Sequence, residues 1–238
     1  MINIGLTFLL SYIAGSIPFG LLFVWIFAGK DVRLVESGRT GGTNAMRAAG
    51  LIAGILTATG DTLKGVATGW LAGWLAPEYP WVRVVAALLA ILGHNYSVFL
   101  IEKRSIGGLR LRGGAGGAPA FGGAISLWHF SGLIIFPLGA LVYLLVGYAS
   151  ITTMSIAFFS ILVFAVRAAM GLSPWVYVAY GFGALAMVIW ALRPNLERLR
   201  QGNERVVGLR AYLKKQREAK SHQNTRPRSN HQQQHNHI

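Results

Sequence analysis

Long apolar runs alternate with shorter polar, glycine-rich segments along most of this chain. Backbone amides cannot stay unpaired in hydrocarbon, and about 20 helical residues cross one bilayer, so such runs are typical of transmembrane helices. Seven runs cover residues 4–28, 51–76, 82–101, 118–128, 130–147, 151–169 and 174–192. The pattern predicts an all-α integral membrane protein with about seven transmembrane helices, of which the fourth is too short to cross alone.

The composition agrees with a membrane protein. Hydrophobic residues make up 53% of the 238 residues and charged residues only 13%. One soluble core of this size cannot bury so much apolar surface, so the bilayer serves as solvent. The chain has no cysteine, which excludes a thiolate nucleophile, a disulfide framework and cysteine-ligated zinc. We expect no metal site and no cofactor.

Positive charge is concentrated between and after the apolar runs. Segments 29–50, 102–117 and 193–238 hold four, four and eleven of the 22 Lys and Arg residues. The positive-inside rule therefore predicts that these segments are cytoplasmic, with the N-terminus outside and the C-terminus inside. Basic ends beside spans typically meet anionic headgroups, so the net charge of +14 indicates membrane lipids, not nucleic acid, as partners.

The chain divides near residue 208. Residues 1–208 carry the apolar runs and are expected to form one membrane domain. Residues 209–238 are basic, lack an apolar period beyond one helical turn and end in a Gln/His/Asn-rich run. We expect them to form a disordered cytoplasmic tail.

The first inside segment contains a glycine-rich stretch with the chemistry of an anion site. Gly38 and its neighbours allow the backbone to turn amides toward a phosphate, and Arg47 offers a bidentate phosphate contact. Ser37, Thr43 and Asn44 add neutral hydrogen-bonding groups. The alternative is a flexible polar loop whose arginines only set the topology.

Ionisable residues also occur within the apolar runs. Asp61 and Lys64 lie on one helical face of the second run. Such residues at membrane depth are functional candidates, although a self-neutralising ion pair is the alternative. His94, at the cytoplasmic end of the third run, is either a base or an interfacial hydrogen-bonding residue.

A second glycine-rich stretch, residues 107–117, includes Arg112, Gly113, Gly114 and Gly116. It precedes a short apolar helix, whose N-terminal amides would favour an anion. The alternative is close packing against neighbouring helices, which also selects small residues. After the last run, Pro194 begins an amphipathic turn that suits an interfacial helix.

Taken in order, these motifs resemble those of the bacterial acyl-phosphate:glycerol-3-phosphate acyltransferases of the PlsY type, over about residues 15–208. The first loop is similar to that family's Ser-Gly-Asn-x-Gly-Ala-Thr-Asn-x-x-Arg motif, at Ser37, Gly38, Gly41, Thr43, Asn44 and Arg47. Other matches to the family's patterns are Asp61, Lys64, Gly65, Gly93, His94, Phe99, Asn195, Arg198, Leu199, Gly202 and Glu204.

Several positions depart from the family's motifs, among them Gly42 in the first and Pro119, in place of threonine, in the second. Ala115 stands where the second motif, similar to Gly-Gly-Lys-Gly-Val-Ala-Thr, carries lysine, and Leu192 replaces the histidine of the third. Arg110 and Arg112 are the candidates to supply the missing positive charge. Arg39 stands where the first motif has asparagine, so we expect Arg39→Asn to be tolerated and Arg47→Lys to be damaging.

The resemblance implies transfer of a fatty acyl group from acyl phosphate to glycerol 3-phosphate, giving lysophosphatidic acid for phospholipid synthesis at the bacterial inner membrane. It implies catalytic roles for Ser37, Arg47, Asn195 and Glu204. It implies substrate-binding roles for Gly38, Thr43, Asn44, Lys64, His94, Arg112, Gly113, Gly114 and Gly116. The alternatives are a non-catalytic relative that binds glycerophosphate or phospholipid, and a small-solute transporter. The sequence does not fix the oligomeric state.

Overall fold

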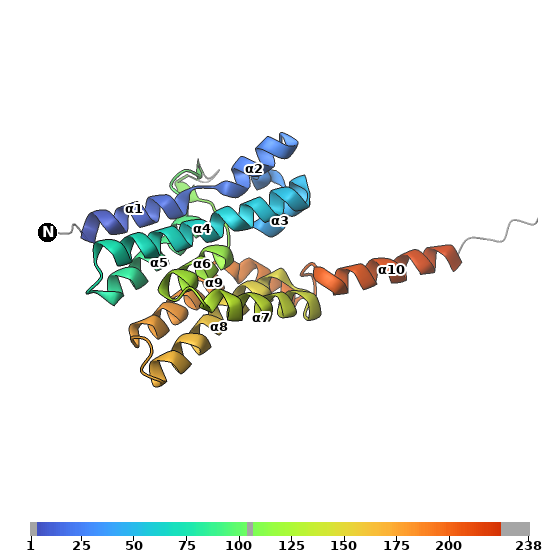
Figure 1. Ribbon diagram of the computed structural model, residues 1–238. Coiled ribbons are helices and arrows are strands. Elements are labelled where there is room, and N and C mark those ends of the chain that lie inside the picture. The colour runs from blue at the N-terminus through green and yellow to red at the C-terminus, as the bar shows by residue number, and fades with distance from the viewer. Residues whose placement is uncertain (1–3, 104–106, 225–238) are drawn as a thin grey trace, which may run out of the picture.

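The computed structural model describes residues 4–103 and 107–224. Its helices are α1 (Ile4–Ser16), α2 (Phe19–Ala28), the 3-10 helix η1 (Val32–Leu34), α3 (Gly42–Ala49), α4 (Leu51–Leu75), α5 (Pro80–Asn95), α6 (Gly117–Leu127), α7 (Ser131–Leu145), α8 (Ala149–Ala169), α9 (Val176–Arg200) and α10 (Gly208–Asn224) (Figure 1). Two short strands, β1 (Ile101–Lys103) and β2 (Leu109–Leu111), form an antiparallel hairpin. Each predicted apolar run is largely helical, and the all-α prediction misses only this hairpin.

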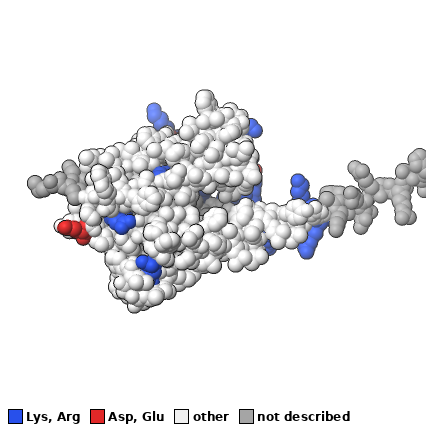
Figure 2. All heavy atoms as spheres, in the orientation of Figure 1, with Lys and Arg blue, Asp and Glu red and all other residues white. Residues whose placement is uncertain are grey.

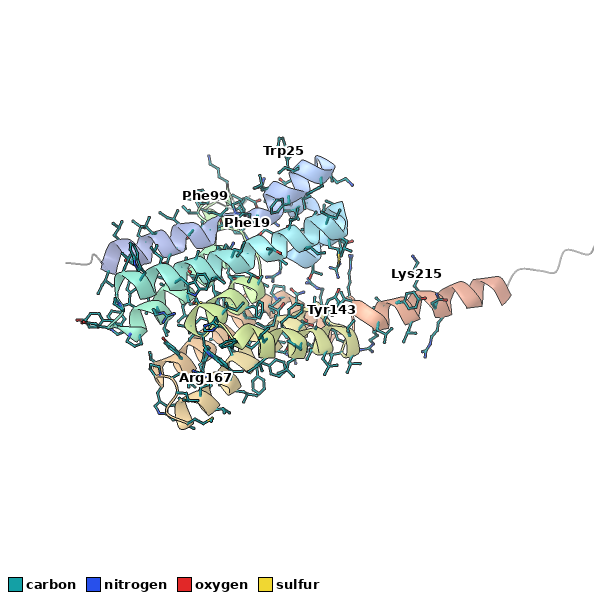
Figure 3. All side chains as sticks on the ribbon, viewed as in Figure 1. Phe19, Trp25, Phe99, Tyr143, Arg167 and Lys215 are labelled. Atoms are coloured by element: carbon teal, nitrogen blue, oxygen red, sulfur yellow. The ribbon has the colours of Figure 1, made fainter. Side chains whose placement is uncertain are left out.

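The outer surface of the helices is apolar. Three helical stretches of the described residues, Ile4–Ala28, Ala149–Ala169 and Val176–Arg200, are long and apolar enough to cross a membrane, and Pro80–Asn95 and Ser131–Leu145 are shorter apolar helices. Trp25 and Phe99 project outward with 67% and 56% of their surfaces exposed (Figure 3). Figure 2 shows a face of the bundle that is mostly uncharged, with Lys and Arg atoms on α10. The chain is thus a helical membrane protein.

The first apolar run is broken near its middle. Pro18 lacks a backbone N–H and disfavours helical geometry at the preceding residue, so α1 ends at Ser16 and α2 begins at Phe19. The Ile17 carbonyl at the break accepts a hydrogen bond from Lys64 Nζ at 3.0 Å. The predicted single helix over 4–28 is therefore two helices joined by a bend.

The core lies where α5, α6, α8 and α9 meet. Ile91, Phe164 and Tyr180 are fully buried there, and the Tyr180 hydroxyl donates to the Ala120 carbonyl at 2.6 Å. Helices α4 and α6 pack so closely that a Cβ at Gly122 would collide with the Thr62 carbonyl oxygen. Small residues thus let these backbones approach, as is common for helices in membranes.

Two further segments differ from the sequence-based expectation. Helix α5 ends at Asn95, so the run predicted to reach residue 101 leaves the helix six residues earlier and leads into the hairpin. Helix α9 continues through Pro194 to Arg200, where a separate interfacial turn was expected.

The expected disordered tail is helical over α10, which projects from one end of the bundle; residues 225–238 lie outside the described residues (Figure 1). Its first turn packs against α7, whose Tyr143 carbonyl lies beside Gly208. Tertiary contact thus supports the first turn of α10.

Candidate active site

Four residues expected to be catalytic line one cavity at the α3 end of the bundle. Ser37 comes from the loop after η1, Arg47 from α3, Asn195 from α9, and Glu204 from the segment before α10. The cavity measures about 130 Å³ and is also lined by Glu36, Arg198, Asn203 and Arg205. Ser37 and Arg47 are exposed to solvent, so a polar ligand can reach them. Residues about 150 positions apart in the sequence therefore share one site.

The back of this cavity is an ordered polar network. Asn195 Nδ2 donates to Glu204 Oε1 at 2.9 Å, and Arg198 Nε lies 3.5 Å from Glu204 Oε2. Asn195 Oδ1 is buried and has no hydrogen-bond partner among the described residues. Arg205 pairs with Glu36 and joins this segment to the first loop. The network fixes the Asn195 and Glu204 side chains on one wall.

Asn44 shapes the loop that presents Ser37. It is buried, and its amide nitrogen donates to the carbonyls of Val32, Val35 and Arg39 at 3.1, 3.0 and 2.9 Å. Ser37 Oγ accepts a weaker bond from the Arg39 amide at 3.4 Å. The Asn44 amide group is thus directed into the loop, while Thr43 lies in the first turn of α3 beside it.

The loop is also held by charge at its start. Asp31 accepts hydrogen bonds from the Arg33 amide at 2.9 Å and from the Arg33 side chain at 2.7–3.0 Å. These bonds lower the pKa of Asp31, so its carboxylate stays ionised at neutral pH.

The last part of the second glycine-rich stretch, residues 113–117 (the glycine loop), lies directly on the end of α5. The Gly114 amide donates to the His94 carbonyl at 2.9 Å, and a Cβ at Gly114 would collide with His94 Nε2. Gly116 has φ +87°, a left-handed conformation that glycine adopts readily, and it caps the N-terminus of α6. Close packing thus explains these glycines, while the first amides of α6 still lack intrahelical acceptors.

Beneath the glycine loop lies a buried polar cluster. Lys64 Nζ is 2.8 Å from Asp61 Oδ1 and 2.9 Å from His94 Nδ1, and His94 Nδ1 is 3.3 Å from Asp61 Oδ1. All three residues are at most 5% exposed. The expected ion pair between Asp61 and Lys64 therefore exists, and His94 contacts both of its members. Lys64 and His94 support the loop from below and do not line either of the cavities described here.

Arg112 is directed toward a carboxylate. Its Nη1 lies 3.1 Å from Glu102 Oε1 on the hairpin, and Arg33 Nη1 lies 3.4 Å from the same oxygen. Arg110 faces Glu102 across the two strands. Gly38 lies beside Arg112, because a Cβ there would be 2.6 Å from Arg112 Nη2. Arg112 and Arg110 were expected to replace the missing lysine. In the structure Arg112 is paired with Glu102, and Arg110 lies on the hairpin opposite the same residue.

Arg39 reaches the glycine loop instead. Its Nη1 donates to the Gly114 carbonyl at 3.2 Å and its Nη2 donates to the Ala191 carbonyl. These contacts do not fit the expectation that asparagine is tolerated at position 39. The sequence gave one sign that Arg39 makes such contacts, which is an arginine where the motif pattern has asparagine.

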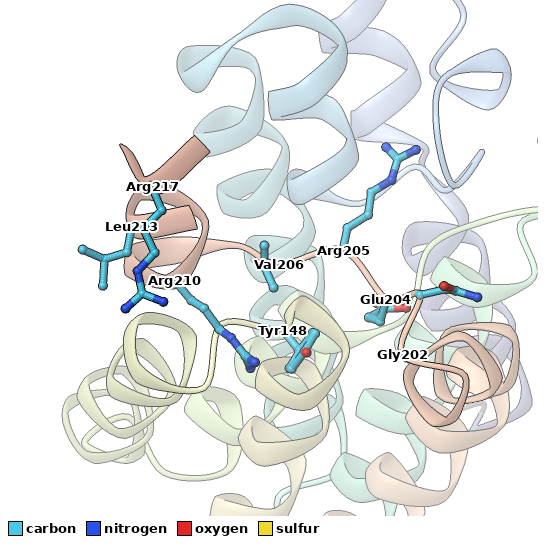
Figure 4. A pocket seen from close by; sticks show the side chains of 9 residues that line it. Tyr148, Gly202, Glu204, Arg205, Val206, Arg210, Leu213 and Arg217 are labelled. Atoms are coloured by element: carbon cyan, nitrogen blue, oxygen red, sulfur yellow. The ribbon is translucent and has the colours of Figure 1, made fainter. Parts of the chain in front are cut away.

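A second, larger cavity adjoins the first. It measures about 840 Å³ and shares Asn203, Glu204 and Arg205 with the smaller cavity. Figure 4 shows Arg210 and Arg217 of α10 on one side, with the Arg210 guanidinium beside Tyr148, and Glu204 and Arg205 on the other. The Arg210 guanidinium carbon lies 5.1 Å from the centre of the Tyr148 ring. The smaller cavity thus leads into a wider basic opening at the same end of the bundle.

The chain as a whole is similar to known proteins. The sequence matches the family model described as glycerol-3-phosphate acyltransferase over residues 5–202. The chain belongs to the glycerol-3-phosphate acyltransferase family. Named members include one from Rubrobacter xylanophilus, 40% identical over 85% of this chain and 94% of its own length. Another, from Thermus thermophilus, is 38% identical over 86% of this chain and 96% of its own length.

Solved structures give the same result. Two crystal structures of PlsY, described as an integral membrane glycerol 3-phosphate acyltransferase, match 89% of this chain and 98% of their own chains. The glycerol 3-phosphate form has a TM-score of 0.73 at 27% identity, and the lysophosphatidic acid form has 0.71 at 26%. The predicted family and the predicted enzyme class, an acyltransferase, are confirmed. These matches do not support the non-catalytic or transporter alternatives.

Proposed function

We propose that this acyltransferase moves a fatty acyl group from an acyl phosphate to a hydroxyl of glycerol 3-phosphate, yielding lysophosphatidic acid and phosphate. The observation that carries the proposal is the convergence of Ser37, Arg47, Asn195 and Glu204 on one cavity. The cavity lies beside a glycine loop capped by Arg39. Two phosphate-bearing substrates need two anion sites, and the first loop and the glycine loop supply them.

In this scheme Arg47 binds the phosphate of glycerol 3-phosphate. A guanidinium offers a planar fork to phosphate oxygens, and Arg47 lines the cavity opening with an exposed side chain. Ser37 orients the glycerol hydroxyl, while Asn195 and Glu204 form the opposite wall through their mutual hydrogen bond. Gly38, Thr43 and Asn44 hold the first loop in the shape that presents these groups.

The glycine loop and the first amides of α6 hold the acyl phosphate. Helix N-termini present unpaired amides and a positive dipole end to anions. Lys64 and His94 hold this loop in place through the buried cluster beneath it, and Gly113 and Gly114 allow its close approach to α5. Arg112 anchors the hairpin next to Gly38.

The reaction needs positioning more than strong acids or bases. The glycerol hydroxyl oxygen forms a bond to the acyl carbon, and the C–O bond between the acyl carbon and the phosphate breaks. The released phosphate takes up the hydroxyl proton. Because the acyl phosphate is already activated, orientation and charge stabilisation are the main demands on the protein.

The position of this cavity supports the topology that we propose. Figure 1 shows α3 and the start of α10 at the end of the bundle opposite the N-terminus, so the cavity lies at the end that carries the basic helix α10. The positive-inside rule places that face in the cytoplasm, with the N-terminus outside and about seven helices crossing the bacterial inner membrane. The substrates then meet at the cytoplasmic leaflet, where the acyl chain lies among membrane lipids.

The direct test uses the purified full chain in lipid nanodiscs with palmitoyl phosphate and labelled glycerol 3-phosphate. We expect lysophosphatidic acid and phosphate in equal amounts, and none when palmitoyl-CoA replaces the acyl phosphate. Ser37→Ala serves as the matched variant and should lower turnover. Product from palmitoyl-CoA alone, or no product from either donor, would overturn the proposal.

A further inference from the structure

Two arginines without a carboxylate partner line the larger cavity, of about 840 Å³. Arg210 and Arg217 belong to α10, and among the side chains that the structure describes no carboxylate lies within 4.0 Å of either guanidinium. The other charged residues of the wall, Glu204 and Arg205, are each paired with a residue of the smaller cavity. Two positive charges are therefore left for an anionic ligand.

The inner wall of this cavity is a fixed part of the fold. The Val207 amide donates to the Gly147 carbonyl at 2.8 Å, and Val206 pairs with Tyr148 in a short antiparallel bridge. Arg210 packs on the same turn, because a Cβ at Gly147 would be 2.8 Å from the Arg210 Cβ. Its guanidinium lies beside the Tyr148 ring, an arrangement that holds the charge at the cavity wall (Figure 4). The turn between α7 and α8 thus positions the first of the two arginines.

The first turns of α10 carry an apolar face next to the lipid-facing surface of α7. Leu209, Tyr212 and Leu213 are exposed, and their spacing of three and four residues places them on one side of the helix. Gly208 lies against the end of α7, where α10 begins. Near that end α7 exposes Leu141, Leu144 and Leu145. Because Leu213 also lines the cavity, the cavity borders on this apolar surface.

Tyrosines mark the depth of the cavity in the membrane. Tyr143 lies in the last turns of α7, Tyr148 in the turn before α8, and Tyr212 in the first turns of α10 (Figure 3). Tyrosine is enriched where hydrocarbon meets water, so this end of the bundle lies at headgroup level. Residues 208–224 hold five Lys and Arg residues and one Glu, a balance that favours anionic headgroups.

We propose that this cavity binds one anionic diacyl phospholipid of the bilayer, with its phosphate between Arg210 and Arg217 and its acyl chains along the apolar faces of α10 and α7. This is a discrete site, in addition to the general attraction of a basic segment to anionic lipid. Both arginines lie beyond residues 5–202, the stretch that matches the family model. The inference does not depend on the proposed transfer reaction.

The chemistry of the site selects a lipid with net negative charge. A guanidinium binds phosphate oxygens through paired N–H donors. Phosphatidylglycerol offers such a phosphate without a cation. Phosphatidylcholine brings a quaternary ammonium group as well, and two arginines without counterions repel it. The cavity volume is in the usual range for a ligand pocket, so a headgroup fits.

The test is native mass spectrometry of the full chain in a non-ionic detergent, titrated with dioleoyl phosphatidylglycerol or dioleoyl phosphatidylcholine. The masses count the lipids on each chain and therefore separate one saturable site from diffuse attraction. Arg210→Gln, Arg217→Gln and the double variant are compared with the parent chain. Lys215→Gln is the matched control, because Lys215 is an exposed cation of α10 that does not line the cavity (Figure 3). Thermal unfolding of each variant reports folding.

We expect the parent chain to bind one phosphatidylglycerol at least about tenfold more tightly than phosphatidylcholine, since each basic residue at the surface adds roughly a fivefold preference for anionic lipid. The double variant should lose this preference. Arg217→Gln alone should weaken phosphatidylglycerol binding by about three- to fivefold, and Lys215→Gln should change it by less than about twofold.

Equal binding of the two lipids by the parent chain would overturn the proposal. Equal losses in Lys215→Gln and Arg217→Gln would also overturn it, and would show only diffuse attraction to a basic helix. If Arg210→Gln, which removes packing on Tyr148, does not fold, Arg217→Gln decides, and unchanged affinity in that variant counts against the site.

Two other occupants would be recognised in the same spectra. Displacement of phosphatidylglycerol by excess glycerol 3-phosphate or inorganic phosphate would show that the cavity takes free phosphate, and would refute a lipid site. A dimer that dissociates in Arg217→Gln, with no lipid bound, would assign the face to a second copy of the chain. Because no readout is turnover, a chain that makes no lysophosphatidic acid refutes the proposed function and leaves this inference to be decided by lipid binding alone.

Discussion

Replacing Arg47 by lysine tests the acceptor side of the site. Lysine keeps the charge but loses the planar fork that binds two phosphate oxygens. A hydrogen bond to a charged group contributes about 1.5–3 kcal/mol, and each 1.4 kcal/mol is one decade in kcat/KM. Because the Arg47 side chain is exposed in the structure, we expect the lower end, roughly a tenfold loss.

The assay is steady-state transfer in nanodiscs with glycerol 3-phosphate varied at saturating palmitoyl phosphate. The loss in Arg47→Lys should appear in kcat/KM for glycerol 3-phosphate, while the Michaelis constant for palmitoyl phosphate stays unchanged. Arg200→Lys is the matched control, because Arg200 is an exposed arginine near the end of α9 that does not line the cavity.

Two results would refute this reasoning. If Arg47→Lys and Arg200→Lys behave alike, the first loop only sets topology and Arg47 does not bind the acceptor phosphate. If the loss appears for palmitoyl phosphate instead, the two anion sites have been assigned to the wrong substrates.

Three further predictions follow from the packing and the topology. Gly114→Ala places a methyl group against His94 Nε2, well inside van der Waals contact, so we expect thermal unfolding to show a loss of about 1–3 kcal/mol together with reduced turnover; unchanged stability and turnover would contradict the close packing. Truncation after Gly208 should leave turnover within about twofold, since terminal segments are often dispensable; a larger loss would assign α10 to the site. A reporter inserted at Glu78 should be outside and one fused after residue 224 cytoplasmic, and the reverse would place the cavity on the wrong side of the membrane.

The apolar pattern predicted the helices well because the requirement that forms them acts within each run. Residues in hydrocarbon must satisfy their amides within the helix, so the runs ending at Ala28, Ala169 and Leu192 became helices whatever they contact. Pro18 shows the limit of this rule. The run around it is apolar throughout, yet the helix breaks there, because proline cannot donate a backbone hydrogen bond and disfavours helical geometry at the residue before it.

The motif residues were also found from the sequence, but their arrangement was not. Ser37, Arg47, Asn195 and Glu204 were singled out by residue type and order, and the structure brings them to one cavity. Lys64 and His94 were singled out in the same way, and the structure buries both below the glycine loop. Their roles stay predictions until variants are assayed.

The sequence by itself determined a helical membrane protein with two glycine-rich loops and the motifs of its family, because periodicity, charge bias and motif spacing are properties of contiguous residues. Only the tertiary structure decided that Arg39 contacts Gly114 and Ala191. Those contacts join segments about 75 and 150 positions apart, and their distance is set by how α4, α5, α6 and α9 pack. These contacts exist only once those helices are in place, so no local pattern could reveal them.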